Sequence, residues 1–174
     1  MPSTVSTLFA RFVAPAALAV VGLTTGCSSW RLSEPAQAPI APMAAPPEGM
    51  AKICVVRADE AAHEVTFPVH DNGVLVGATR GPGHFCYLAE PGHHVVESAA
   101  DEVATATIDA APGGRYTLLQ EVEDRLGHVT CRASWVGEKE AREHVTATPY
   151  AQLVGVPSEE KLPEAVPRAA AIRR

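Results

Sequence analysis

Short runs of β-branched and aromatic residues, separated by turn signals, constrain the fold of this chain more than any other feature of its sequence. Residues 52–57 are mostly β-branched and apolar, and Val65, Phe67 and Val69 alternate with other residues, so that one face of this second run is expected to be buried. The Asp-Asn-Gly sequence at 71–73 predicts a tight hairpin turn, because Asn and Gly tolerate positive φ angles. Strands this short, at this spacing, are typical of an all-β sandwich.

Further strands are expected along the same part of the chain. They are predicted at residues 74–76, 85–88, 94–98, 103–110, 116–122 and 129–135. Pro68 lacks a backbone donor, which predicts that its strand lies at a sheet edge. Residues 137–150 change to a helical period, with Ala141 and Val145 expected to face the sheets. The fold expected for residues 51–155 is therefore mainly β: a small antiparallel β-sandwich, immunoglobulin-like or transthyretin-like, with one C-terminal helix.

The N-terminus has the pattern of a bacterial lipoprotein signal. Arg11 precedes an apolar run over 12–23, which is too short for a permanent membrane span, and Gly26 precedes Cys27. This stretch resembles a lipobox, although Thr24 stands where Leu is usual. We therefore expect a signal peptide over 1–26 and acylation of Cys27, whose acyl chains would anchor the protein in a membrane of the bacterial cell envelope. Ser28 after the cysteine favours the outer membrane, with the protein facing the periplasm.

Composition changes again on either side of the strand region. Residues 27–50 are rich in Pro and Ala, which predicts a semi-extended tether; a loop folded back on the domain is the alternative. Residues 156–174 carry prolines and scattered charges, which predicts a disordered tail. The net charge of −6, without a Lys/Arg cluster, argues against nucleic acid as a partner.

The strand motifs, taken in order, resemble bacterial envelope lipoproteins of the domain of unknown function 2846, and they also look like PEGA-type surface sandwiches. The segments that carry the resemblance are 53–57 (ICVVR), 69–77 (VHDNGVLVG), 85–87 (FCY), 90–94 (EPGHH) and 114–116 (GRY). The resemblance covers roughly residues 51–153. It implies the fold and the envelope location, and it implies neither catalytic residues nor a reaction.

Cysteine usage predicts one disulfide. Three cysteines remain once Cys27 is acylated, and the envelope is oxidising. Cys131 shares a strand face with Val129 and Trp135, which indicates a buried thiol. We therefore expect Cys54 and Cys86 to be bonded, with three buried thiols as the alternative.

Candidate chemistry is sparse. His84, Cys86 and Cys54 form a conceivable zinc set, but the histidines are better read as solvated residues beside turns, and we expect no metal. The adjacent His93 and His94 would point to opposite faces of a strand. No nucleophile elbow or phosphate loop is present, and acidic clusters at 101–102 and 121–124 are typical of solvated strand ends, so neither an enzyme nor a bound cofactor is expected.

Five aromatic residues occupy apolar-alternating strand positions, which predicts that they lie in the core. They are Phe67, Phe85, Tyr87, Tyr116 and Trp135. A stacking platform for sugars, which would need two or three of these rings exposed and coplanar, is the alternative; the hydroxyls of Tyr87 and Tyr116 must reach a partner or water in either case. The function expected from the sequence is a non-enzymatic structural or protein-interaction module of the envelope; the alternative is a module that binds glycan or peptidoglycan.

Overall fold

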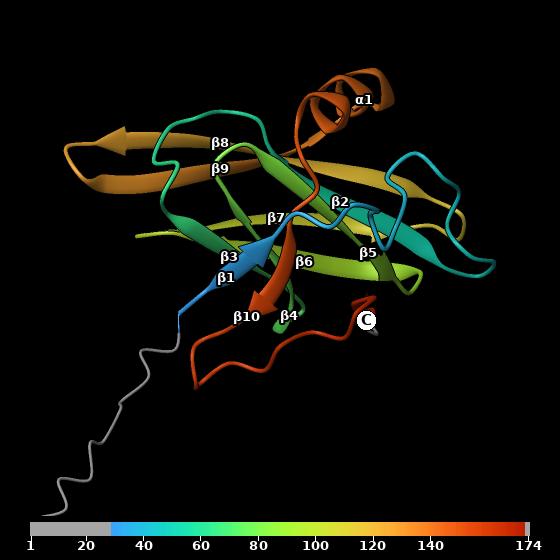
Figure 1. Cartoon of the computed structure of the whole chain (residues 1–174). Helices are drawn as coiled ribbons and strands as arrows, with labels where there is room; N and C mark the ends of the chain where they lie inside the picture. The colour runs from blue at the N-terminus through green and yellow to red at the C-terminus, as the bar shows by residue number, and fades with distance from the viewer. Residues whose placement is uncertain (1–28, 173–174) are drawn as a thin grey trace, which may run out of the picture.

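The computed structural model describes residues 29–172 as a mainly β protein with one short helix (Figure 1). The larger sheet has five strands in the order β11-β5-β2-β8-β9. Its strands are β2 (Ala51–Arg57), β5 (Gly83–Ala89), β8 (Arg115–Arg125), β9 (His128–Val136) and β11 (Arg168–Ala169). All of these except β11 fall on runs that the sequence predicted.

The second sheet has four strands in the order β4-β3-β6-β7. They are β3 (Thr66–Asp71), β4 (Val74–Arg80), β6 (Gly92–Ala99) and β7 (Val103–Ala110). The predicted hairpin joins β3 to β4, and both of its turn residues have positive φ, 51° at Asn72 and 79° at Gly73. Val65, which was expected in the buried face of β3, lies outside the strand and is exposed.

The two large sheets enclose one hydrophobic core. Ile53 and Val55 of the first sheet pack with Val69 and Val96 of the second, and all four are fully buried. A polar bridge also crosses this core, because Thr79 donates to Oε1 of Gln120 (2.6 Å) and the Gln120 amide donates to Ser98 (2.8 Å). Each of these polar atoms has a partner, so the bridge avoids the cost of burying unpaired groups.

The sheets also approach each other at one side, where β7 lies against β9 and the β layer curls into a half-barrel. The indole Nε1 of Trp135 donates to the carbonyl of Thr107 across this junction (2.8 Å).

Helix α1 (Glu138–Ala147) lies against the outer face of the five-stranded sheet, over β8 and β2 (Figure 1). As predicted, Ala141 and Val145 are its buried residues. On its exposed face, Glu138 lies 3.4 Å from Arg142 and Glu140 lies 3.7 Å from His144, each at the i,i+4 spacing that supports a helix.

Two expectations about the sheets need correction. The larger sheet is mixed and not antiparallel, because β2 pairs in parallel with β8 and β11 pairs in parallel with β5. Strand β3 lies inside its sheet and not at an edge. Pro68 is nevertheless tolerated, because it pairs only with Ala78 of β4 and the pairing of β3 with β6 begins at Val69.

The segment before β2, as far as it is described, lies on the domain and differs from the extended tether expected for 27–50. Strand β1 (Arg31–Ser33) pairs with β10 (Gln152–Gly155). Farther along, the Lys52 ammonium donates to the carbonyls of Ala41 and Ala44. These contacts match the folded-back alternative, because a buried cation holds carbonyl groups that an extended chain would leave in water.

The C-terminal arm, which we define as residues 156–172, also differs from the disordered tail that was expected. It runs along the domain and ends in β11, which adds to the edge of β5 (Figure 1). Ala169 of β11 is 1% exposed and belongs to the main core cluster. Burial of this small side chain, together with the backbone hydrogen bonds that Pro167 and Ala169 accept from β5 and the turn after it, therefore holds the end of the arm on the domain.

No helix within residues 29–172 is long and apolar enough to cross a membrane.

Candidate functional site

One side of β5 is only partly covered by other backbone. The opposite side of β5 pairs with β2 along its whole length. On the partly covered side, His84 bonds to the backbone at 149–151, with His84 N donating to the Pro149 carbonyl and Ala151 N donating to the His84 carbonyl. Farther along, Leu88 N donates to the carbonyl of Pro167. We call this side, from His84 to Glu90, the β5 edge.

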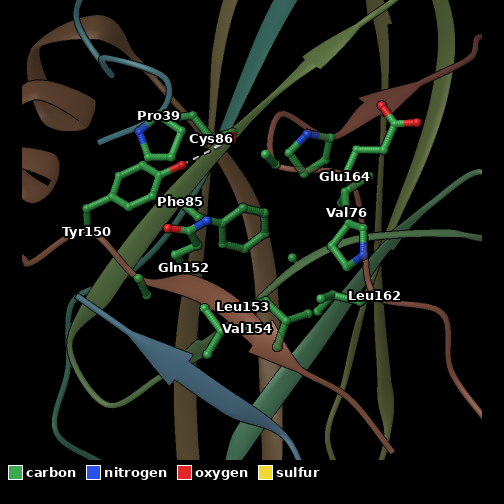
Figure 2. A pocket seen from close by; sticks show the side chains of 15 residues that line it. Pro39, Val76, Phe85, Cys86, Tyr150, Gln152, Leu153, Val154, Leu162 and Glu164 are labelled. Atoms are coloured by element: carbon green, nitrogen blue, oxygen red, sulfur yellow. Dashed lines mark hydrogen bonds between the residues drawn. The ribbon is translucent and has the colours of Figure 1, made fainter. Parts of the chain in front are cut away.

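Cys86 lies between these two attachments. Alternate residues of a strand direct their backbone groups to the same side, so the N–H and C=O of Cys86 point outward like those of His84 and Leu88. The hydroxyl of Tyr150 reaches the Cys86 carbonyl at 3.5 Å, the outer limit of a hydrogen bond (Figure 2). Cys86 therefore presents a backbone donor and a weakly bonded acceptor at a gap in the strand pairing.

A cleft of about 270 Å³ opens at this gap (Figure 2). Its lining is largely apolar and comes from β4, β5, β10 and the C-terminal arm. The residues are Pro39, Val76, Gly77, Phe85, Cys86, Tyr150, Ala151, Gln152, Leu153, Val154, Leu162, Pro163, Glu164, Ala165 and Pro167. An apolar cleft with a few backbone and side-chain polar groups suits an extended apolar chain better than a charged ligand.

The floor of the cleft depends on a close approach between two neighbouring strands. The Phe85 ring lies against Gly77, where a Cβ atom would come within 2.3 Å of the ring. Glycine at this position therefore lets the ring approach β4 closely.

One wall of the cleft is the C-terminal arm itself. Leu162 of the arm is 43% exposed, and the carboxylate of Glu164 is turned away from the Phe85 ring (Figure 2). The wall thus consists of proline-containing chain that lies outside any helix or strand.

Beneath the cleft, Cys54 and Cys86 are joined by a disulfide, as the sequence predicted. The two residues are directly opposed on β2 and β5, with Cα atoms 4.0 Å apart. The bond removes two of the three ligands of the conceivable zinc set with His84. The third cysteine expected in the mature chain, Cys131, is a partly buried thiol, and burial raises its pKa to about 11. Cys27, the predicted lipidation site, lies outside the described residues.

A buried charged cluster that the sequence did not suggest lies close to the end of the β5 edge. His93 and His94 point to opposite faces of β6, as predicted, and His94 is fully buried. The Asp71 carboxylate accepts hydrogen bonds from Tyr87 (2.9 Å) and from Nδ1 of His94 (2.8 Å), while Nε2 of His94 donates to the Glu90 carbonyl (2.7 Å).

Both ring nitrogens of His94 face acceptors, so the protonated imidazolium suits this position. Burial by itself would lower the pKa of His94, but the hydrogen bonds and charges of Asp71 and Glu90 outweigh it and raise that pKa above its ordinary value. Burial, followed by the Asp71 charge, raises the pKa of Tyr87 well above its ordinary value. One feature of the sequence could have indicated that Asp71 is buried. The alternation that buries Phe67 and Val69 on one face of β3 continues to Asp71.

The aromatic residues do not form an exposed platform. Phe67, Phe85 and Tyr87 are at most 3% exposed. Tyr116 and Trp135 are partly buried and pack edge to face, with ring centroids 6.4 Å apart. The expectation that these rings lie in or against the core is confirmed.

The acidic clusters at 101–102 and 121–124 lie around the β8–β9 hairpin as exposed ion pairs. Glu123 pairs with Arg125 (2.6 Å) and Glu121 with Arg132 (2.9 Å). His128 lies 3.5 Å from Asp101. The acidic residues of both clusters are exposed, as expected of solvated strand ends. No group of metal-binding geometry is found among the described residues.

No protein-family model matches the chain, and neither a curated protein nor a solved structure matches it.

Proposed function

We propose that this chain is a lipid-anchored protein of the bacterial cell envelope. Among the envelope locations, we propose the outer membrane, with the protein facing the periplasm. The lipobox-like sequence before Cys27 supports this location. The Cys54–Cys86 disulfide agrees with an oxidising compartment. The resemblance of the strand motifs to lipoproteins of the domain of unknown function 2846 favours the same location, and with it an immunoglobulin-like or transthyretin-like sandwich.

Within the envelope, we propose that the domain is a non-enzymatic interaction module that docks an extended segment of a protein. The observation that carries this is the gap in the β5 edge, where the backbone of Cys86 faces an apolar cleft of about 270 Å³. Extended peptides bind such edges through main-chain hydrogen bonds, while small pockets select alternate side chains.

The domain's own chain indicates which segments fit. At the β5 edge, the C-terminal arm pairs through Arg168 and Ala169 in an extended conformation. Ala169 occupies the position of the arm next to the core, and Pro163 and Pro167 of the arm line the neighbouring cleft. A segment of small apolar residues with flanking proline therefore has the chemistry that this edge accepts.

Sugar stacking, the alternative function, would need exposed aromatic rings. The aromatic residues proposed for it are buried or packed against each other. Nothing in the described part of the chain favours the glycan alternative over peptide docking.

Replacing Cys27 with Ser tests the anchor. The variant should be released from membranes or keep its signal peptide, whereas Cys131→Ser, the matched control, should remain membrane-bound at mature size. A membrane-bound Cys27→Ser product of mature size would contradict lipid anchoring.

A labelled peptide with the sequence of residues 163–172 tests docking at the β5 edge. In the full chain, Ala169→Glu places a carboxylate at a core position, which should detach the arm, because an unpaired buried charge is costly. This variant should bind the peptide more tightly than the wild type, whose own arm competes, and a peptide carrying the same Ala169→Glu change should not bind.

Binding in this experiment is read by fluorescence anisotropy and by the amide NMR signals of Leu88 and Glu90. If Ala169→Glu fails to fold, the same signals in the wild type with excess peptide give the answer. Absence of saturable, site-specific binding to either protein would contradict docking at this edge.

A further inference from the structure

We infer that the partner segment at the β5 edge is the C-terminal arm of a second copy of this chain, so that two copies exchange their arms. This inference rests on the proposed function, in which the β5 edge docks an extended segment. In the single copy, the same edge holds the copy's own arm.

The β5 edge and the start of β6 are matched to this arm at three backbone positions. Leu88 N donates to the Pro167 carbonyl (3.0 Å) and Glu90 N donates to the Ala169 carbonyl (2.9 Å). Farther on, Ile172 N donates to the carbonyl of His93 (3.0 Å). These hydrogen bonds involve only backbone atoms of the arm, so the arm of another copy can form the same hydrogen bonds.

Side chains add specificity for this particular segment. The Asn72 amide donates to the carbonyl of Ala170 (2.8 Å). Ala169 fills a core position at 1% exposure, where a larger side chain would not fit. A Cβ atom on Gly92 would come within 2.6 Å of the Ala171 side chain, so the glycine makes room for the arm to pass. A segment that satisfies all three conditions exists in every copy of this chain.

The connection to the arm is suited to exchange. Between β10 and β11, the described chain forms neither a helix nor a strand. Pro157, Pro163 and Pro167 favour an extended conformation there. The 12 residues from 156 to 167, at about 3.1 Å each in polyproline geometry, extend to roughly 37 Å, enough to reach an adjacent molecule.

Exchange is also energetically inexpensive. Each arm gives up and regains the same contacts, and two copies that trade arms form a closed, symmetric pair. The strand that must detach is short, because β11 has only two residues. Anchoring of both copies in one membrane, as proposed above, would raise their effective concentration and favour the exchanged state.

Cysteine trapping between two tagged copies tests the exchange in the full-length chain in its membrane. One copy carries His93→Cys and the other carries Ile172→Cys, both in a Cys131→Ala background. These two positions form an antiparallel bridge in the structure. Since neither copy holds both cysteines, a disulfide between them forms only when the arm of one lies on the edge of the other.

Two controls accompany this pair. In the first, the Ile172→Cys partner is replaced by Leu126→Cys, a fully exposed hairpin position that measures random collision in the membrane. In the second, one copy carries both His93→Cys and Ile172→Cys, and an internal disulfide shows that the arm lies as the structure places it.

We expect the His93→Cys and Ile172→Cys copies to give at least about tenfold more linked dimer than the collision control, because exchange places the thiols in contact. Equal yields, with the internal disulfide formed, would overturn exchange and leave docking at the edge intact. If the internal disulfide also fails to form and the arm peptide does not bind, docking at the β5 edge is overturned as well.

Discussion

The imidazole Nδ1 of His94 lies 2.8 Å from Oδ2 of Asp71, and neither side chain is exposed to solvent. The second ring nitrogen of His94 donates to the Glu90 carbonyl, in the turn that leads into β6. Glu90 N in turn donates to the carbonyl of Ala169 in the C-terminal arm. A buried, hydrogen-bonded pair of His94 and Asp71 thus supports the turn on which the arm docks.

Asp71→Asn should destabilise the domain by about 3–5 kcal/mol, because it leaves the buried imidazolium without its counter-charge. The matched control is Glu123→Gln, which breaks an exposed pair with Arg125 and should cost at most about 1 kcal/mol. Urea unfolding of both variants measures the difference. Similar losses for the two would show that His94 is not held as a buried cation.

Stability should depend on pH through His94. Its pKa is raised in the folded state above the ordinary value of 6.5, so the stabilisation is fully present below pH 6.5 and is lost as pH rises through the folded-state value. The stability advantage of the wild type over His94→Gln should therefore shrink as the buffer is taken from pH 6 toward alkaline values. An advantage that grows with pH would contradict this account.

His84 should make the stability of the domain depend on pH in the opposite direction. Burial lowers its pKa, against a raising effect of the hydrogen bond to Thr148, so its contribution is present above pH 6.5 and is lost as pH falls through the folded-state value. Comparing His84→Asn with His94→Gln over the same series separates the two histidines, because the two variants should change the pH profile in opposite directions.

Removing the Cys54–Cys86 bond should lower the free energy of unfolding by about 3–4 kcal/mol, since the bond closes a loop across a sequence separation of 32 residues. The double variant Cys54→Ala/Cys86→Ala is compared with Cys131→Ala, which leaves the bond in place. Thiol counting of the denatured, unreduced mature protein should find only Cys131. Three reactive thiols would contradict the pairing.

Local residue patterns predicted most of the strands, but they did not predict which strands pair with each other. The turn at Asn72 and Gly73 was identifiable because those residue types accept positive φ. The parallel pairing of β2 with β8 was not, because alternation shows which face of a strand is buried without identifying its neighbours.

The terminal segments were mispredicted for a specific physical reason. Many prolines in residues 27–50, and prolines with scattered charges in the C-terminal arm, suggested that these segments bury too little apolar surface to become ordered. In the structure, the contacts of Lys52 and the buried methyl group of Ala169 fix these segments. Such contacts involve single residues, so neither composition nor periodicity reveals them.

The cleft could not be predicted from the sequence either. Its position follows from how Pro149–Ala151 and β11 each cover part of the β5 edge, which depends on the path of the folded chain. Only the disulfide beneath it was predictable, by counting cysteines.

Lys52→Met should release the segment at 41–50 while leaving the sheets folded. Burial, with repulsion from Arg115, lowers the pKa of Lys52 to about 8, so it remains mostly charged at neutral pH and donates to the carbonyls of Ala41 and Ala44. Methionine preserves the length of the stem but removes the donor. Hydrogen exchange at 41–50 should increase, and it should not increase in the control Lys139→Met, whose side chain is exposed on α1. Unchanged exchange in Lys52→Met would show that other contacts hold the segment.

Gly77→Ala should narrow the cleft and destabilise the domain. The added Cβ atom would approach the Phe85 ring to 2.3 Å, so the ring must move into the core or into the cleft, at a cost of about 1–3 kcal/mol. Gly137→Ala is the matched control, since an added Cβ there meets nothing within 4 Å and should cost less than about 1 kcal/mol.

The same pair of variants links stability to docking. If the displaced ring enters the cleft, Gly77→Ala should also weaken binding of the peptide of residues 163–172 to an arm-detached chain, whereas Gly137→Ala should not. Thermal denaturation and peptide anisotropy, measured on both variants, give the two readouts. Equal stability of Gly77→Ala and Gly137→Ala would mean that the approach of β4 to Phe85 is looser than the structure shows.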